Sequence, residues 1–477
     1  MDEKLGEFLT SFNAAVTLAQ EYRGHADEHR RIATALSGFM SQPGGELPVV
    51  AENFPAHRFA DLDIALEKLA GSDPEATLLG MGGGQQRHHV DLADIFHEGY
   101  SYIPVGQPDY VNLPIGPDSY RQALTLGIRL FRYRGSPMAV MQRAADPQSG
   151  RNTPSLSVLT ADRAVAAAFL AEIQTELSRS SILRGQVVSF THNPYGQEAA
   201  GVSFLVRPQL AEKDVILPPG VLGKVSAHVL GIAGHRSELQ SRGQHLKRGV
   251  LLYGPPGTGK THTVRRLLSA SEGTTAVLLS GGSLAAVSEA AKLARAMAPS
   301  LVILEDIDLV AEDRSFGHGP QPLLFEVLDA LDGLDSDADV AFIMTTNRVD
   351  VLERALAQRP GRVDLAVEIP MPDTGSRARL LALYSPDGMF SPQALSQAAE
   401  QSEGATASFA RELVRRAILS ALTAGEEPGD AHLLLAVEEL MGQGEELTRS
   451  LLGAAAGAED SGPGSGWLAA SGESMGS

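Results

Sequence analysis

The segment Leu251–Thr261 constrains the fold of this chain more than any other, because its glycines are spaced as in a phosphate-binding loop. It reads Leu-Leu-Tyr-Gly-Pro-Pro-Gly-Thr-Gly-Lys-Thr. An apolar run that predicts a strand precedes the glycines, and a helical pattern begins near His262. Glycines let backbone N–H groups close around phosphate oxygens, and the N-terminus of the following helix favours negative charge. The sequence therefore predicts a binding site for a nucleoside triphosphate.

Two side chains of this loop have expected chemical roles. Lys260 is expected to reach the β- and γ-phosphates, and the hydroxyl of Thr261 is expected to ligate Mg²⁺. The predicted ATP-binding set is Gly254, Pro255, Pro256, Gly257, Thr258, Gly259, Lys260, Thr261 and His262.

The composition excludes several functional classes. The chain has 477 residues, of which 43% are hydrophobic, and this length suits about three domains. It has no cysteine, which excludes disulfides, cysteine-ligated zinc and thiol catalysis. Its formal net charge of −19 repels phosphate backbones, so nucleic acid is not expected to be the main partner.

The sequence also gives no sign of a membrane partner. Its first residues are not a basic segment followed by an apolar core, so no signal peptide is predicted. No uninterrupted apolar run reaches the ~18 residues that would predict a membrane span. We therefore expect a cytoplasmic protein.

Changes in periodicity and composition divide the chain into six segments. They are a helical region at 1–75, a mixed α/β region at 76–210, a linker and helix at 211–245, an α/β region at 246–373, a helical region at 374–445 and a disordered tail at 446–477.

Before residue 210, the spacing of apolar residues predicts a series of elements. We expect helices at 59–69, 119–131 and 161–177, and strands at 137–143, 155–159, 187–190 and 202–206. Residues 100–117 are rich in Pro, Gly and Tyr and predict a loop. Gly80–Gly84 is interpreted as a flexible connector, because no lysine and no clear strand-helix frame accompany its glycines.

A polar stretch follows this connector. It contains His88, His89, Asp91, Asp94 and His97, and such side chains can ligate metal ions. Their spacing matches no metal motif, so the pattern favours a solvated polar segment.

Strands and helices alternate after the phosphate-binding loop. The predicted strands are 276–279, 301–304 and 340–345, and the predicted helices are 262–270, 284–297 and 323–331. This alternation predicts an α/β fold with a doubly wound parallel sheet.

Two of these strands end in polar side chains that suit phosphoryl chemistry. The strand at 301–304 runs into Glu305 and Asp306, and two adjacent carboxylates can divide the support of a metal ion and the polarisation of water. Asn347 follows the next strand, where its amide could orient the attacking water.

Two arginines are held on a stiff turn further along the chain. Arg359 and Arg362 flank Pro-Gly, and the planar guanidinium suits a developing phosphoryl charge. The residues alone leave open whether these arginines act within their own subunit or on a neighbour.

In this order, the motifs resemble those of the AAA subfamily of the AAA+ ATPases over residues 215–440. The most specific similarities are at Leu246–Tyr253, Thr345–Arg348 and Arg359–Asp364. The resemblance implies a P-loop NTPase sheet followed by a small α-helical lid, with the mixed α/β region before them. It identifies Gly254–Thr261 as Walker A and Leu301–Asp306 as Walker B.

The resemblance also implies how subunits complete the site. Asn347 would be the sensor-1 residue, and Arg359 and Arg362 would complete the site of a neighbouring subunit. The nucleotide then lies between subunits of a ring, usually of six. Ala407 and Ser408 occupy the lid position where the subfamily carries Gly-Ala, so no sensor-2 arginine is expected there.

Three departures from the family qualify this interpretation. The family usually ends Walker B with Asp-Glu, whereas this chain has Glu305-Asp306, an order similar to that of the mitochondrial Bcs-type proteins. Asp306 would then activate water and Glu305 would support Mg²⁺ through water. The segment Leu279–Val287 lacks the aromatic pore residue of threading members, although Phe316 and His318 could line a pore instead. No H-E-x-x-H follows, which excludes a metalloprotease.

We therefore interpret the chain as an ATP hydrolase that forms a homo-oligomeric ring, a hexamer by its resemblance to the family. It would remodel a protein client or adaptor bound by its first 210 residues. A weakly hydrolysing, nucleotide-gated assembly switch or scaffold is the main alternative. A DNA-acting loader is disfavoured by the charge.

Overall fold

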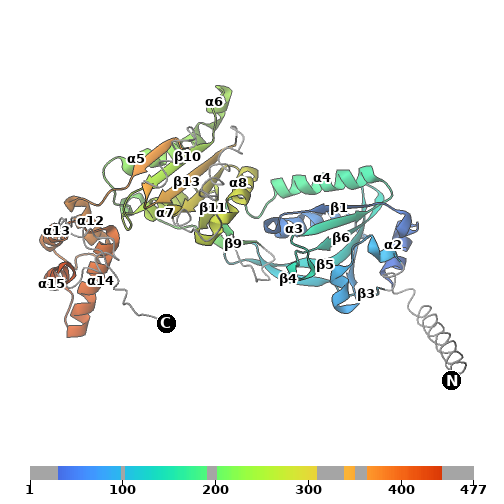
Figure 1. The fold of residues 1–477 in the computed structure, drawn as a ribbon, viewed down its shortest axis with the longest axis horizontal. Coiled ribbons are helices and arrows are strands. Elements are labelled where there is room, and N and C mark those ends of the chain that lie inside the picture. Colours follow the sequence, from blue (N-terminus) through green and yellow to red (C-terminus); the bar gives the residue numbers. More distant parts are fainter. Residues whose placement is uncertain (1–30, 98–102, 191–200, 309–337, 350–362, 443–477) are drawn as a thin grey trace, which may run out of the picture.

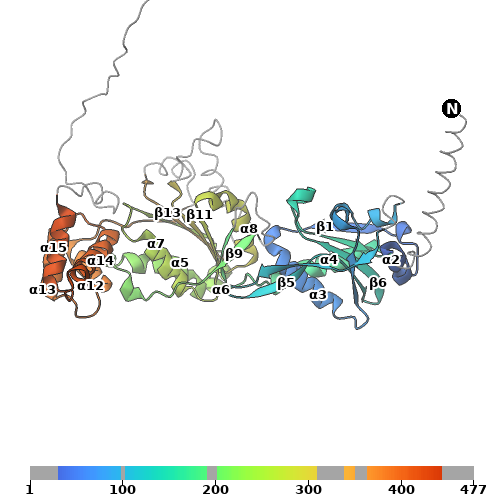
Figure 2. The ribbon, with the colours of Figure 1, turned by 90° about the horizontal axis from the view of Figure 1, so that it is seen from below.

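A computed structural model describes residues 31–97, 103–190, 201–308, 338–349 and 363–442. These residues form three lobes in a row, which Figures 1 and 2 show from two directions. In chain order we call them the N-terminal lobe (up to residue 180), the core lobe (181–372) and the lid (373–442).

Several sequence predictions fall outside the described residues. They are residues 1–30 of the predicted helical region at 1–75, the helix at 323–331, the pore candidates Phe316 and His318, the arginines Arg359 and Arg362, and the tail at 446–477.

The N-terminal lobe contains an antiparallel sheet in the order β1-β7-β6-β5-β2-β3, with β4 paired to β5. Helices α3 and α4 pack on one face of this sheet and α2 on the other. The elements are α2 (Ile32–Met40), β1 (Val49–Asn53), α3 (Phe59–Ala70), β2 (Thr77–Met81), β3 (Val105–Gly106), β4 (Asp109–Pro114), β5 (Tyr120–Tyr133), β6 (Ser136–Arg143), β7 (Ser155–Leu159) and α4 (Arg163–Arg179).

The predicted helix at 119–131 is wrong, because this segment is the long strand β5. Leu124, Ile128 and Phe131 do have helical spacing, which explains the error. In the fold, β5 pairs with β6 along one edge and with β4 and β2 along the other. Two rows of interstrand hydrogen bonds outweigh the local pattern here.

Two stretches predicted as a loop and a connector also contain strands. Residues 100–117 include β3 and β4, and Gly80 lies within β2. A Cβ atom on Gly80 would lie 2.0 Å from the backbone carbonyl carbon of Gln107. Glycine is therefore needed for the close approach of two chain segments rather than for flexibility.

The core lobe is built on a sheet in the order β14-β10-β13-β12-β11-β8-β9, in which every pair is parallel except β8 with β9. Helices α5 and α7 pack on one face and α8 on the other, which is the doubly wound arrangement that the sequence predicts. The elements are β8 (Val187–Phe190), β9 (Val202–Leu205), α5 (Val221–Gly234), α6 (Arg236–Ser241), β10 (Arg248–Tyr253), α7 (Lys260–Ala270), β11 (Thr275–Ser280), α8 (Val287–Ala296), β12 (Ser300–Glu305), β13 (Val340–Thr346) and β14 (Leu365–Glu368).

The strand pairings differ from the predicted division of the chain in two places. β1 comes from the segment at 1–75 but pairs with β7 in the N-terminal lobe. β8 and β9 come from the segment at 76–210, but β8 pairs with β11 and extends the core sheet. Both pairings join segments far apart in the sequence, which local periodicity does not reveal.

Polar contacts attach the N-terminal lobe to the core lobe. Asp61 on α3 accepts hydrogen bonds from the Ser181 hydroxyl at 2.6 Å and from the Ile182 backbone N–H at 2.8 Å. Arg184 donates to the carbonyl oxygen of Ala298, just after α8, at 3.2 Å. The segment entering β8 is thereby bonded to both lobes.

The lid consists of helices whose buried apolar side chains form a cluster of their own. This agrees with the helical region that the sequence predicts from residue 374. The helices are α12 (Thr374–Tyr384), α13 (Pro392–Gln401), α14 (Ala407–Ala424) and α15 (Asp430–Met441).

Candidate functional site

The loop between β10 and α7 takes a shape that depends on glycine. Gly254, Gly257 and Gly259 all have positive φ angles, of 144°, 75° and 113°. A Cβ atom on Gly254 would lie 2.2 Å from the carbonyl oxygen of Ile369, just after β14. The loop therefore runs close against its neighbouring strand, and α7 begins at the carboxyl edge of the sheet with its N-terminus available to an anion.

Lys260 lies between this loop and the acidic end of β12. Its ammonium group donates to the carbonyl oxygens of Gly254 and Pro255, both at 2.8 Å. Burial lowers the pKa of Lys260, while Asp306 and Asp308 act in the opposite direction. A lysine in this position can reach the terminal phosphates of a bound nucleotide.

The two carboxylates at the end of β12 have different partners. Glu305 accepts a side-chain hydrogen bond from Thr261, and Asp306 accepts one from Asn347. Burial raises the pKa of both carboxyl groups, and the neighbouring Asp308 raises that of Asp306 further. The structure thus brings together, in two hydrogen-bonded pairs, four side chains that the sequence singled out.

The backbone at Asp306 is strained and is held by the adjacent strand β13. Its φ angle of 52° lies in the left-handed region, which is costly for a residue with a Cβ atom. Its N–H donates to the hydroxyl of Thr345 at 3.0 Å. The hydroxyl of Thr346 and the N–H of Asn347 donate to Asp308 at 2.9 and 3.2 Å. No role for these two threonines or for Asp308 was predicted from the sequence, although each lies within two residues of Asp306 or Asn347 along the chain.

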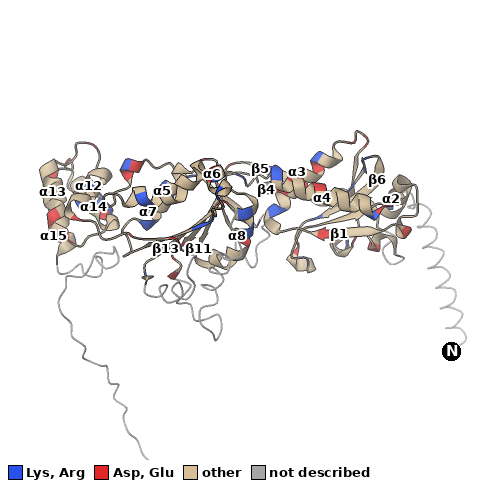
Figure 3. Ribbon diagram, turned by 90° about the horizontal axis from the view of Figure 1, so that it is seen from above, with Lys and Arg blue, Asp and Glu red and all other residues tan. Residues whose placement is uncertain are grey.

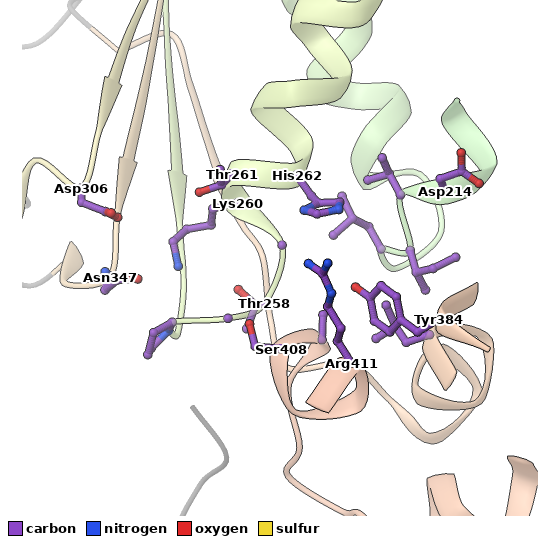
Figure 4. A pocket seen from close by; sticks show the side chains of 18 residues that line it. Asp214, Thr258, Lys260, Thr261, His262, Asp306, Asn347, Tyr384, Ser408 and Arg411 are labelled. Atoms are coloured by element: carbon purple, nitrogen blue, oxygen red, sulfur yellow. The ribbon is translucent and has the colours of Figure 1, made fainter. Parts of the chain in front are cut away.

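A cavity of about 330 Å³ lies beside the loop, between the core lobe and the lid (Figure 4). Gly254, Pro255 and Glu305 do not line it and instead contact residues that do. The predicted residues that line it are Pro256, Gly257, Thr258, Gly259, Lys260, Thr261, His262, Asp306 and Asn347.

The rest of the cavity wall comes from segments that the sequence analysis did not connect with the loop. The N–H of Ala407, at the start of α14, donates to the carbonyl oxygen of Gly257 at 3.1 Å and brings the lid against the loop. Helices α12 and α14 then place their side chains in the cavity (Figure 4). The added lining residues are Asp214, Val215, Ile216, Leu217, Leu380, Tyr384, Ala407, Ser408 and Arg411.

The alternative sites considered from the sequence gain no support from the described residues. Across those residues, no group of three or more His, Asp or Glu side chains is placed to hold a metal ion. His89, Asp91 and His97 are exposed, whereas His88 and Asp94 are half-buried. Asp91 forms an ion pair with the buried Arg143. Acidic and basic residues are both spread over the three lobes (Figure 3). Among the helices described, none is long and apolar enough to cross a membrane.

One segment of the chain, which contains most of this site, matches a known protein family. Residues 250–371, which include both carboxylates, Asn347 and the loop, match the family described as "ATPase family associated with various cellular activities (AAA)".

Curated proteins with similar sequences share part of the chain. The chain is 35% identical over 164 residues to the 26S proteasome regulatory subunit 8 homolog of Saccharomyces cerevisiae, covering 32% of this chain and 40% of that protein. It is 37% identical over 152 residues to the 26S proteasome regulatory subunit 8 of Caenorhabditis elegans (29% and 36%). It is 33% identical over 165 residues to the 26S protease regulatory subunit 6A of the same organism (32% and 38%). The chain therefore spans well under half of the length of these relatives.

Proposed function

Since the chain is a member of the AAA family of the AAA+ ATPases, we propose that it binds and hydrolyses ATP and uses the turnover to remodel a protein client. One observation carries this proposal: Thr261 is bonded to Glu305, and Asn347 to Asp306, at the edge of the cavity that the phosphate-binding loop lines. Such paired groups serve metal support and water activation in phosphoryl transfer.

The residues of the site then have distinct tasks. Lys260 binds the terminal phosphates, and the backbone N–H groups of the loop bind the others. Asp306 accepts a proton from the attacking water, and Asn347, which donates to Asp306, orients that water. The strained backbone of Asp306 and its bond to Thr345 fix the direction of the carboxylate.

The donor set at Thr261 fits Mg²⁺. A hydroxyl bonded to a carboxylate offers the hard oxygen ligands that Mg²⁺ prefers, and this ion usually keeps several waters beside substrate phosphates rather than a full protein cage. Thr261 would hold the ion directly and Glu305 through water. When bound, Mg²⁺ neutralises charge on the β- and γ-oxygens.

We further propose a ring of six subunits, the usual number in the family, in which Arg359 and Arg362 of one subunit complete the site of the next. Support comes from the resemblance of Arg359–Asp364 to the AAA subfamily and from the relatives, which are named as regulatory subunits of a larger assembly. The arginines of one subunit could reach the nucleotide site of the next both in a ring of identical copies and in a ring that includes other subunits. The N-terminal lobe is the candidate binding surface for the client.

A nucleotide-gated switch or scaffold is the second candidate. Ser280 and Ser283 cap one another at the start of a short 3-10 helix, Gly281–Ala286, where threading relatives carry an aromatic loop. This segment has no aromatic side chain and is already closed by its own hydrogen bonds. A scaffold would bind ATP without appreciable turnover.

Steady-state phosphate release separates the two candidates. Wild-type protein should release phosphate, and Lys260→Ala should abolish the release because the terminal phosphates lose their cation. Equal rates for both proteins would refute hydrolysis at this site. An Asp306→Asn variant, trapped with ATP, should then retain a protein client that Lys260→Ala does not retain.

A further inference from the structure

Arg411 is a charged side chain of the cavity to which the family motifs quoted above assign no role. It lies on α14, one helical turn beyond the lid position Ala407-Ser408, and it lines the cavity. Its side chain is exposed, and within the described part of the chain it has no hydrogen bond or ion pair. Arg415, one turn further on the same helix, is instead bonded to Glu412 at 2.6 Å. Among the described residues, the Arg411 guanidinium is therefore the one cation of this helix segment that no acidic side chain pairs with.

The guanidinium occupies one particular end of the cavity. Figure 4 shows it between His262 and Tyr384, on the other side of the loop from Lys260 and Asp306. Burial lowers the pKa of His262, and the charges of Arg265 and then Arg411 lower it further. Burial raises the pKa of Tyr384, and the charge of Arg411 opposes that rise. The shifts of Lys260 and Asp306 have other causes. Arg411 thus lies away from the groups that receive the terminal phosphates.

The direction of the bound nucleotide follows from the two ends of the cavity. The γ-phosphate belongs at Lys260, Asp306 and Asn347, where the hydrolytic groups gather. The apolar wall made by Val215–Leu217 and Leu380 suits the base. The α-phosphate then lies between them, beside the first turn of α7, which is where the Arg411 guanidinium is found.

We propose that Arg411 binds the α-phosphate from the lid of the same chain, so that the lid responds to the presence of a nucleotide and not to its γ-phosphate. This inference rests on the proposed nucleotide site. Because the N–H of Ala407 already bonds the loop at Gly257, α14 begins beside the phosphate-binding loop and carries Arg411 one turn further along. ADP and ATP carry the same α-phosphate, so both should hold the lid.

The test is the affinity of Arg411→Met for ADP and for a hydrolysis-resistant ATP analogue, measured by calorimetry. Methionine keeps an unbranched apolar stem and removes the charge. A charge-assisted bond to phosphate predicts that both dissociation constants rise by a similar factor, roughly tenfold to a hundredfold. Arg411→Lys should recover part of the loss for both ligands, and Arg415→Met should bind both as the wild type does.

Two results would overturn the inference. A loss confined to the ATP analogue would assign Arg411 to the γ-phosphate, and unchanged affinity for both ligands would assign it no nucleotide contact. Thermal unfolding of each variant checks that α14 is intact, and the Arg411→Lys variant provides the comparison if Arg411→Met unfolds early. Wild-type protein that binds neither ligand would instead refute the proposed function itself.

Discussion

Replacing Gly254 by alanine should damage the nucleotide site through the backbone alone. The new Cβ atom would lie 2.2 Å from the carbonyl oxygen of Ile369, far inside ordinary contact. Ile369 cannot easily give way, because its N–H donates to the carbonyl oxygen of Tyr253 at 2.7 Å. The loop must therefore move by about 1 Å, and a misplacement of that size can cost about a hundredfold in turnover.

Gly273→Ala provides a matched control for this substitution. Gly273 also has a positive φ angle, of 76°, but no atom lies within 4 Å of the position where its Cβ would be. Alanine there should cost only the left-handed backbone strain, about 1–2 kcal/mol. Gly273→Ala should therefore lower the free energy of unfolding by about this amount. Gly254→Ala should lower it by more, because the contact with Ile369 adds to the strain.

Urea denaturation and steady-state phosphate release measure the two effects. Gly273→Ala should retain near-wild-type turnover per folded molecule, whereas Gly254→Ala should lose most of its turnover and bind ADP more weakly. If the two variants have equal stability and equal turnover, the close approach of the loop to Ile369 is not what shapes the site.

Three further substitutions test the electrostatics of the fold. Asp339 is buried and accepts a hydrogen bond from the buried Arg248 at 2.7 Å, so Asp339→Asn should lower the free energy of unfolding by about 3–5 kcal/mol in urea denaturation. Burial raises the pKa of Asp306, so its ionisation destabilises the fold as pH rises through that pKa. Without nucleotide and metal, Asp306→Asn should therefore have a higher melting temperature than the wild type at pH 7. This difference in melting temperature should shrink as the pH is lowered below the ordinary range of aspartate pKa values. Burial lowers the pKa of His57 from 6.5 to about 4. The free energy of unfolding should therefore fall by up to about 3 kcal/mol as the pH falls through that interval. Acid titrations of stability should show His57→Gln to be less acid-sensitive than the wild type, and the exposed His89→Gln should match the wild type.

The parts of the site that the sequence predicts are those whose signal is local. The loop, the carboxylates at the end of β12 and Asn347 at the end of β13 each follow a buried strand, and parallel strands bring their carboxyl ends to one edge. The parallel core was therefore predictable from the alternation of strands and helices. Arg411 was not, because its place in the cavity depends on the docking of the lid, which leaves no spacing in the sequence.

The errors in the N-terminal half have a different cause. β5 satisfies both helical and strand spacing, and only its pairing along both edges decides between them. The alternation of apolar residues in β8 and β9 correctly predicts two strands, which pair with each other. It does not reveal that β8 also pairs with β11, roughly 90 residues further along the chain. Local patterns thus identify β8 and β9 as strands but do not identify the sheet to which they belong.

The contacts of the two side chains explain how the reversed Glu305-Asp306 order fits the site. The longer side chain, Glu305, reaches across to Thr261 on α7, whereas the shorter Asp306 interacts with Asn347, just after the adjacent strand β13. Asp306 also has a left-handed backbone that Thr345 holds in place, so its carboxylate is directed by the main chain rather than by side-chain length. A carboxylate with one methylene fewer is therefore compatible with water activation here, because the strain at Asp306 supplies the direction that a longer side chain would otherwise need. Backbone strain of this kind clusters at active sites, so its presence at Asp306 beside Asn347 favours the hydrolysing enzyme over the scaffold.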